Sequence, residues 1–182
     1  MRKIMATINM TLDGHCDHTD VIADNELHRH FNELLKNAGT ILYGRTTYQL
    51  MEASWPPIVL HPTGQAPIDE FALLIENIEK IVFSRTLKTL SWKNSRLAQA
   101  SLEEAVRALR AMQGKEIFAG SPSLIAALSN MDLIDEYQLA LQPLVAGKGL
   151  ILFKNHTHRL NLRLLQTKIL SSGVVILYYA RS

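Results

Sequence analysis

The sequence KEIFAGSPSLIAAL, residues 115–128, predicts a short buried strand, a turn of small residues and then a helix. Gly120 lets a ligand approach the backbone, and the hydroxyl of Ser121 suits the N-cap of the helix. Pro122 suits the first helical position, because the N–H group that proline lacks would have no partner inside the helix. Free first-turn N–H groups and the helix dipole attract anions, so this stretch indicates a phosphate or pyrophosphate site. The alternative for such a stretch alone is a tight strand-to-helix turn without a ligand.

Composition limits the class of protein. The length of 182 residues predicts a single domain over residues 1–182. With 19 Lys and Arg against 17 Asp and Glu, the formal charge of +2 argues against a nucleic-acid partner. A single cysteine, Cys16, is typical of a reducing compartment, and no apolar run approaches the roughly 20 residues that span a bilayer. We therefore expect a cytoplasmic protein without a membrane segment.

Strands and helices alternate along most of the chain. Strands are predicted at residues 4–10, where Thr7 and Asn9 interrupt an apolar run, and at residues 40–43, 81–83, 117–118 and 134–141, with a weaker one at 92–97. Helices are predicted from Asn25, Arg45, Ile68, Leu102 and Pro122. Two runs rich in β-forming residues, 160–170 and 174–179, flank Ser171, Ser172 and Gly173 and predict a hairpin. The predicted fold is α/β, a three-layer α-β-α arrangement with a mixed, mainly parallel sheet closed by an antiparallel C-terminal hairpin.

Local signals place several helix ends. Asp24 is predicted to cap the first helix and Gly39 to end it. The sequence Trp55-Pro56-Pro57 is predicted to break the second helix, because proline lacks the N–H that continues the hydrogen-bond ladder. Ser101 with Glu104 forms a capping box at the start of the fourth helix.

Polar and glycine residues follow three of the predicted strands. These junctions are Gly44-Arg45-Thr46, Ser84-Arg85-Thr86 and Gly120-Ser121-Pro122-Ser123. In a mainly parallel sheet the carboxyl ends of the strands line one edge, and ligands bind in the crevice there. Because a guanidinium presents a fork of donors to phosphate oxygens, Arg45 and Arg85 are candidate phosphate ligands.

The order of six motifs resembles a known family. TLDG, YGRTTY, VFSRTL, FAGSPSL, DLIDEYQLALQPLVAGKGLILF and SSGVVILYY occur in this sequence in the order found in the dihydrofolate-reductase-like family. That family includes the reductase domain of the bifunctional riboflavin-biosynthesis deaminase/reductase. The resemblance covers nearly the whole chain and implies an NADPH-dependent reductase that transfers a hydride to a small pteridine- or pyrimidine-like substrate. It also implies a homodimer, and the apolar C-terminal hairpin is a suitable surface for one.

The resemblance assigns roles to the residues that match the motifs. Gly44, Arg45 and Thr46 would lie at the cofactor phosphates, Ser84 and Arg85 near the adenosine 2′-phosphate, and Gly120, Ser121 and Ser123 at the pyrophosphate. The chain departs from dihydrofolate reductases at Ala119, where they carry a second glycine. The loop of residues 145–149 resembles a segment near the active site, and an ordinary flexible turn is the alternative.

The substrate side is less well defined. Dihydrofolate reductases bind the pterin through an acidic residue on the first helix, and the comparable turn here offers His28. A neutral histidine does not make the ion-paired, bidentate contact of a carboxylate, which argues against folate reduction. Asp13 is the candidate catalytic group beside the nicotinamide, with a turn-forming role as the alternative.

The same residues are compatible with other functions. A true dihydrofolate reductase, a nucleotide-binding module without turnover and an α/β domain without a ligand are the alternatives to the reductase. His15, Cys16, Asp17 and His18, with His28 and His30, match no standard zinc spacing, and we expect no metal. His156 and His158 are expected to face solvent.

Overall fold

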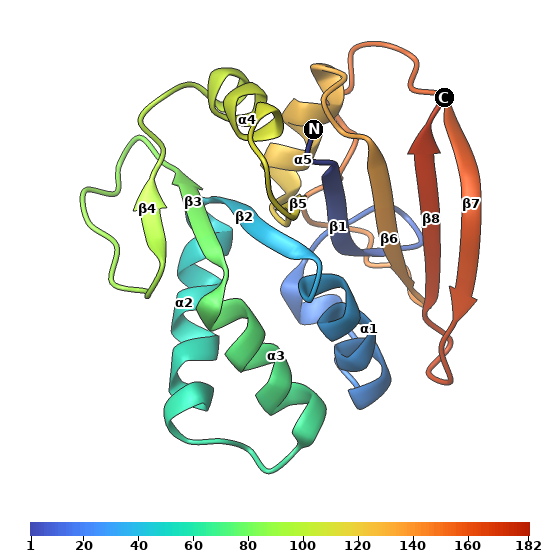
Figure 1. Ribbon diagram of the computed structural model, residues 1–182. Coiled ribbons are helices and arrows are strands. Elements are labelled where there is room, and N and C mark those ends of the chain that lie inside the picture. Colours follow the sequence, from blue (N-terminus) through green and yellow to red (C-terminus); the bar gives the residue numbers. More distant parts are fainter. The chain divides into compact units, whose positions relative to one another are not determined.

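The computed structural model describes residues 1–182 and contains one sheet of eight strands together with helices (Figure 1). The strands are β1 (Ile4–Thr11), β2 (Ala38–Gly44), β3 (Glu79–Phe83), β4 (Ser95–Leu97), β5 (Glu116–Ala119), β6 (Glu136–Gln142), β7 (Leu162–Ile169) and β8 (Val175–Arg181). The α-helices are α1 (Asn25–Leu35), α2 (Arg45–Leu60), α3 (Ala66–Asn77), α4 (Leu102–Ala111) and α5 (Pro122–Asn130), and η1 (His18–Asp20) is a 3₁₀ turn. The strand order is β4-β3-β2-β5-β1-β6-β8-β7, so the prediction of a mixed, mainly parallel sheet with a C-terminal hairpin is confirmed.

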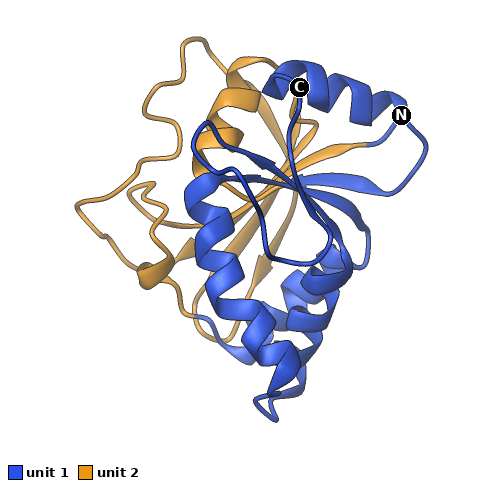
Figure 2. Ribbon diagram, turned by 90° about the vertical axis from the view of Figure 1, so that its left-hand side faces the viewer, with its two compact units in different colours: residues 1–2, 23–118 blue, residues 3–22, 119–182 orange.

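The chain forms two compact units, coloured separately in Figure 2. The first contains Met1–Arg2 and Ala23–Phe118, and the second contains Lys3–Ile22 and Ala119–Ser182. No helix in either unit is both long and apolar enough to cross a membrane.

In the first unit, β2, β3 and β4 are parallel neighbours. The chain passes from β2 to β3 through α2 and α3 and returns from β4 through α4, in the opposite direction along the sheet. Because parallel crossovers are right-handed, the two connections place α2 and α3 on one face of these strands and α4 on the other. Leu42 and Val82 are fully buried between the helix layers, as expected for strands covered on both faces.

In the second unit, β1 pairs with β6 in parallel, while β8 is antiparallel to both β6 and β7. Ser171, Ser172 and Gly173 form the predicted hairpin turn, in which the Gly173 N–H donates to the Leu170 carbonyl over 3.0 Å. Gly173 has φ +87°, a backbone conformation that favours glycine. The turn is therefore determined by local sequence.

The first helix ends earlier than predicted. Asp24 caps it as expected, accepting from the Leu27 N–H at 2.7 Å, but α1 ends at Leu35, and Gly39 is not its C-cap. Gly39 lies inside β2, where an added Cβ would come within 3.0 Å of Arg2 Nη2 and 3.1 Å of Lys115 Cβ. The glycine is needed for close packing of the strand and not for a helix terminus.

The second helix continues through both prolines, so the predicted break at Trp55-Pro56-Pro57 is wrong. Two prolines in the last turns of a 16-residue helix remove only local hydrogen bonds, and packing compensates for them. The ring of Trp55 lies 4.4 Å from that of Phe71 on α3, centroid to centroid, which keeps this end of α2 on its neighbour. The helix ends at Leu60, after which the His61 N–H donates to the Pro57 carbonyl.

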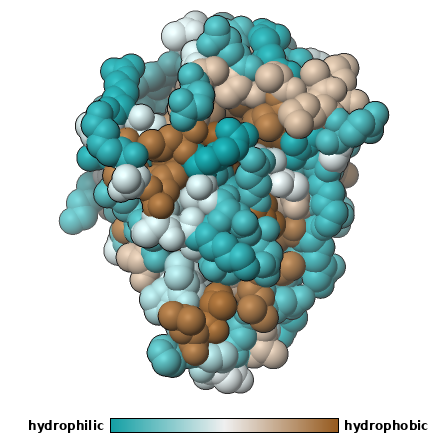
Figure 3. All heavy atoms as spheres, turned by 60° about the vertical axis from the view of Figure 1, so that its left-hand side comes forward, coloured by the Kyte–Doolittle hydropathy of each residue, from teal (hydrophilic) through white to brown (hydrophobic).

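The surface in Figure 3 is mostly hydrophilic, with separate hydrophobic patches. One patch lies at the lower end of that view. The connection from α2 to α3 lies at the same height in Figure 1. Leu60, the last residue of α2, is 75% exposed.

Candidate active site

Two of the predicted junctions share one edge in the first unit. Gly44 at the end of β2 is in register with Phe83 at the end of β3, and the two strands are parallel. The residues that follow, Arg45 and Ser84, therefore leave neighbouring strands at the same level. The sequence predicts that all three junctions meet at one edge, and the register confirms this for these two.

The first junction starts helix α2 without a side-chain cap. Gly44 is the N-cap residue, and it makes no side-chain capping hydrogen bond. Arg45 and Thr46 are the first helical residues, and both are exposed. A helix N-terminus that carries an exposed guanidinium and no side-chain acceptor is suited to an anionic group.

The second junction is a tight turn built by Ser84. Its Oγ accepts from the backbone N–H groups of Thr86 at 3.2 Å and Leu87 at 3.0 Å. Arg85, inside this turn, is exposed to solvent. The serine shapes the turn and Arg85 supplies its positive charge, a division of roles that the sequence does not reveal.

The third junction lies in the second unit and begins helix α5. Pro122 occupies the first helical position as predicted, and Ser121 is the N-cap residue by backbone conformation. The predicted hydroxyl cap is wrong, since the Ser121 side chain makes no capping hydrogen bond and the residue is 1% exposed. Gly120 is half-buried and Ser123 is exposed, so Ser123 is the hydroxyl at this helix start that solvent reaches.

Asp13 joins two loops of the second unit. Its carboxylate accepts from the Thr11 hydroxyl at 2.5 Å and from the N–H groups of Ala146 at 3.1 Å and Gly147 at 2.8 Å. The Nδ1 atom of His15 lies 3.1 Å from Asp13 Oδ2. The turn after β1 and the loop after β6 are therefore held together by one side chain.

Backbone contacts extend this junction. The Leu12 N–H donates to the Leu144 carbonyl, and the Cys16 N–H donates to the Leu150 carbonyl. His15 forms an isolated antiparallel bridge with Ile151, and Gly149 lies so close that an added Cβ would be 3.5 Å from His15 Cδ2. The loop of residues 145–149 is therefore anchored at both ends.

The electrostatics of this region disfavour proton donation by Asp13 or attack by Cys16. Hydrogen bonds, first of all from the Thr11 hydroxyl, hold the pKa of Asp13 well below its usual value. A carboxylate of this kind is ionised at neutral pH and has no proton to give. Burial raises the pKa of the Cys16 thiol to about 12, so it is not a nucleophile at neutral pH.

His28 is buried on α1 among aromatic rings. Its Nδ1 lies 2.8 Å from the Asp24 carbonyl, which makes Nδ1 the donor. The rings of Trp55 and Phe71 lie 6.0 Å and 5.8 Å from the imidazole, both edge-on. The other ring nitrogen, Nε2, is therefore the atom of His28 that remains for a ligand.

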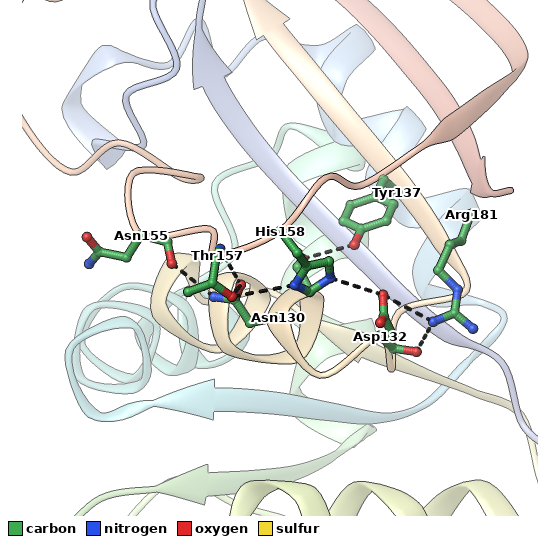
Figure 4. A network of polar contacts seen from close by, with 8 residues as sticks. Asn130, Asp132, Tyr137, Asn155, Thr157, His158 and Arg181 are labelled. Carbon is green, nitrogen blue, oxygen red and sulfur yellow. Dashed lines mark hydrogen bonds and ion pairs between the residues drawn. The ribbon is translucent and has the colours of Figure 1, made fainter.

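Of the two histidines near the C-terminal part, His158 belongs to a separate polar network (Figure 4). Asn130 at the end of α5 accepts from the Thr157 N–H at 2.9 Å and donates to the Asn155 carbonyl at 3.1 Å. His158 is exposed as predicted, but both ring nitrogens of His156 are buried without a hydrogen-bond partner, which corrects the expectation that this residue faces solvent. Its ring lies 4.7 Å from that of His158, so packing on a neighbouring ring covers it. No group of three or more His, Cys, Asp or Glu side chains is arranged to hold a metal ion.

The sequence indicated Asp13 as a site residue but not its partners. Ala146 and Gly147 contribute backbone N–H groups, which carry no residue-specific signal. The sequence signal for this loop was the pair of glycines at 147 and 149. Their φ angles of +71° and +118° are ones that favour glycine.

The mainly parallel eight-stranded sheet with its antiparallel C-terminal hairpin is the fold of dihydrofolate-reductase-like domains. Within that class, the chain belongs to the RibD C-terminal domain family, a reductase domain of riboflavin biosynthesis, whose model matches residues 2–176.

Similar proteins agree with this assignment. The chain is 33% identical over 186 residues to the uncharacterized protein YyaP of Bacillus subtilis (strain 168), covering 98% of this chain and 94% of that protein. It superposes on a putative riboflavin biosynthesis protein from Shewanella sp. PV-4 with a TM-score of 0.77 and 19% identity, over 99% of both chains. Dihydrofolate reductase from Enterococcus faecalis, complexed with NADP(H), gives a TM-score of 0.63 at 14% identity over 99% of this chain and 96% of that one. These two likenesses show the fold.

Proposed function

We propose that the protein is an NADPH-dependent reductase that acts on a small pteridine- or pyrimidine-like substrate, similar to 5-amino-6-(5-phosphoribosylamino)uracil reductase. The observation that carries this proposal is the register of Gly44 with Phe83, which brings Arg45 and Arg85 to one sheet edge beside an uncapped helix N-terminus. The family supports a reductase in general.

The residues at this edge fit a phosphorylated dinucleotide. The first-turn N–H groups of α2 and the Arg45 guanidinium would bind the phosphates, with Thr46 as an additional donor. The exposed Arg85 would bind the 2′-phosphate and thereby select NADPH over NADH. When bound, NADPH would supply the hydride.

The remaining predicted residues have proposed roles in binding and positioning. Gly120, Ser121 and Ser123 are proposed to border the pyrophosphate, Gly120 and Ser123 being the accessible ones. His28 is proposed to face the substrate through Nε2, because its Nδ1 is already engaged by a carbonyl. A true dihydrofolate reductase is less well supported, since by the sequence resemblance the turn where those enzymes carry an acidic residue offers His28 here.

The catalytic role predicted for Asp13 stays a prediction, and the geometry favours a positioning role. Its carboxylate is held by three donors and one imidazole, and its pKa is lowered. We infer that Asp13 fixes the loop of residues 145–149 and that the proton for the reaction comes from another group or from water.

The proposal is tested by calorimetric titration of the full chain with NADPH and NADH at fixed salt. We expect micromolar NADPH binding and at least tenfold weaker NADH binding, about 1.4 kcal/mol. Arg85→Ala should weaken NADPH about tenfold with little effect on NADH, because it removes the partner of the 2′-phosphate alone. Arg107→Ala, an exposed arginine paired with Glu103 on α4, is the matched control and should change neither.

Oxidation of NADPH in the presence of a substrate panel distinguishes a reductase from a nucleotide-binding module. Turnover with any pteridine or pyrimidine supports the reductase. NADPH binding without turnover on the whole panel would favour the binding module. Failure to bind either dinucleotide would contradict the proposal, as would equal losses for both dinucleotides in Arg85→Ala.

The exposed edge of the C-terminal hairpin supports a homodimer. β7 is the last strand of the sheet and has one open side. Leu164 and Ile169 pair with Tyr179 and Val175 on β8, so both project from the same face, and they are 50% and 73% exposed. An edge strand that presents large apolar side chains is a surface for a second chain, and we propose a second copy of this one.

A further inference from the structure

A pocket of about 500 Å³ lies in the first unit, where β2 and β3 begin. Gly39 in β2 and Glu79 at the start of β3 line this pocket, whereas Arg45 and Ser84 follow the opposite ends of the same two parallel strands. The pocket is therefore separate from the edge proposed for the dinucleotide. Its volume lies within the range of small-molecule sites, roughly 300 to 1,000 Å³.

Much of the pocket wall is apolar. Its apolar side chains come from α1, β2, α3 and the residue that follows α3: Leu35, Ala38, Leu73, Leu74 and Ile78. Leu73 and Leu74 lie three and four residues after Glu70, so all three share one face of α3. Because Leu73 is 52% exposed, part of this apolar wall is in contact with water. Removal of such a surface from water favours the binding of an apolar chain.

Both carboxylates that line the pocket already have a cation of their own. Glu70 Oε1 lies 3.2 Å from Lys36 Nζ, and Glu79 Oε1 accepts from Arg96 Nε at 2.9 Å. Glu79 Oε2 also accepts from the Thr40 hydroxyl at 3.0 Å. A cationic ligand would therefore compete with the cations of the protein for these oxygens.

The ammonium of Lys115, in contrast, has no carboxylate partner. Lys115 lines the pocket and is exposed, and its Nζ donates to the Lys36 carbonyl at 2.8 Å. An ammonium has three donors, so two of them remain for solvent or a ligand. Lys115 is therefore the group of this pocket that can bind an anion.

A second cation, Arg2, lies behind the same wall. Arg2 is 8% exposed, its Nε donates to the Lys115 carbonyl, and its Nη2 donates to the Thr40 hydroxyl at 2.8 Å. A Cβ added to Gly39 would lie 3.0 Å from Nη2, so the guanidinium is directly beside this lining residue. Burial lowers the pKa of Arg2, and the charge of Glu79 offsets this effect only in part. This side of the pocket therefore carries positive charge that no carboxylate contacts directly.

We propose that the pocket binds a fatty acid, with the carboxylate on Lys115 and the chain along the face of α3 that contains Leu73. The Lys115 ammonium donates to the carboxylate, and Arg2 contributes its charge from behind the wall. A monoanion suits the site better than a phosphate dianion, because Glu70 and Glu79 line the same pocket and repel a second negative charge. The inference goes beyond the proposed reductase and does not depend on it.

The test is calorimetric titration of the full chain with decanoate, below the concentration at which decanoate forms micelles. Lys115→Met removes the ammonium and keeps an apolar side chain of similar length, so it should weaken decanoate binding at least tenfold. Lys88→Met, at an exposed lysine of the same unit outside the pocket, is the matched control and should bind decanoate like the unmodified chain. A lack of decanoate binding to the unmodified chain, or equal affinity in Lys115→Met, would overturn the proposal.

Two further ligands separate the contributions of the head and the chain. Decyltrimethylammonium has an apolar chain of the same length with the opposite charge, and acetate has the carboxylate without the chain. Each should bind the unmodified chain at least tenfold more weakly than decanoate. Equal affinity for decyltrimethylammonium would reduce the binding to apolar adsorption, equal affinity for acetate would reduce it to anion binding, and either result contradicts a fatty-acid site.

Leu73→Asp tests the apolar wall. The new carboxylate would lie in the path of the chain and repel the ligand, so decanoate binding should fall at least tenfold. Because Leu73 is exposed, the melting temperature should change little, and Leu60→Asp, at an exposed leucine of α2, is the control for both measurements. Should Lys115→Met fail to fold, Leu73→Asp tests the pocket alone, and unchanged decanoate affinity in that folded variant would also overturn the proposal.

NADPH titration of the same variants tells this proposal apart from the proposed function. Lys115→Met and Leu73→Asp should bind NADPH like the unmodified chain, because neither residue belongs to the Arg45 and Arg85 edge. If decanoate binding shows the predicted pattern while neither dinucleotide binds, the reductase proposal fails and the fatty-acid site stands. If NADPH is bound and oxidised while decanoate does not bind, the reverse holds.

Discussion

The Asp13 carboxylate connects the turn after β1 to the loop after β6 by more contacts than a turn-forming aspartate requires. One oxygen accepts from Thr11 and Ala146, and the other accepts from Gly147 beside the His15 imidazole. At neutral pH the group is ionised, because its hydrogen bonds lower its pKa. A negative charge held by backbone N–H groups is well suited to fixing a glycine-containing loop.

Asp13→Asn should loosen this loop. An amide has one acceptor oxygen in place of two, and its NH₂ group would oppose the Gly147 N–H. We expect hydrogen exchange of the segment around Ala146 and Gly147 to become at least tenfold faster, measured by mass spectrometry. Asp17→Asn, which removes the same charge from the nearby turn capped by Asp17, is the control. Unchanged exchange in Asp13→Asn would contradict the positioning role.

At the scale of elements, the end of helix α3 is held by a buried lysine at the start of the next strand. Lys80 Nζ donates to the carbonyls of Ile75 at 2.7 Å, Glu76 at 3.1 Å and Ile78 at 2.9 Å. It also lies 4.4 Å from the centroid of the Trp92 ring. These hydrogen bonds satisfy carbonyls at the helix C-terminus that have no partner inside the helix.

Lys80→Met should lower the free energy of unfolding by about 2 kcal/mol, because buried carbonyls lose their donor. Burial lowers the pKa of Lys80 from 10.5 to about 8, so between these values the unfolded chain binds a proton that the native protein does not. The contribution of Lys80 to stability therefore rises as the pH increases from about 8 toward 10. Urea unfolding at pH 8 and 9.5 should show this rise in the unmodified protein and not in Lys80→Met.

Lys154→Met is the control for this comparison, since Lys154 is exposed and is not among the charges that shift the pKa of Lys80. It should leave both the stability and its pH dependence nearly unchanged. A rise of equal size in Lys80→Met would show that another group titrates in this range.

At the scale of the whole molecule, the open side of β7 is the surface at which we propose that a second copy of the chain binds. Backbone groups on that side are available to another strand, and the β-bulge between Leu164 and Gln166 interrupts the strand. Leu165 at the bulge is 44% exposed, which adds to the apolar surface of Leu164 and Ile169.

Ile169→Lys together with Leu164→Lys should convert a dimer to a monomer, because like charges would meet across the interface without a partner. Light scattering after size-exclusion chromatography measures the mass directly, and the unmodified chain should have about twice the mass of the double variant. Leu60→Lys, at an exposed leucine in the first unit, should remain dimeric. A double variant of unchanged mass would exclude this edge as the interface.

The sequence by itself determined the order of strands and helices, the C-terminal hairpin and the strand-end residues of the first unit. These follow from local physics: apolar runs predict strands, Ser171 to Gly173 predicts a turn, and polar residues such as Arg45 and Arg85 stand directly after strands. The sequence also indicates the family, because the motifs of the family are short segments that occur in a fixed order along the chain.

Tertiary structure decided the features that depend on neighbours distant in sequence. Helix α2 continues through Pro56 and Pro57 because its end packs on α3, although the local propensity predicts a break. Asp13 becomes a loop anchor only when residues 146 and 147 are folded against it. Thr7 and Gln138 are ordinary polar interruptions in the sequence, and only the register of β1 with β6 places their unpaired atoms on one face. The partners of a side chain depend on residues that are distant in sequence, so the local sequence around that side chain does not determine them.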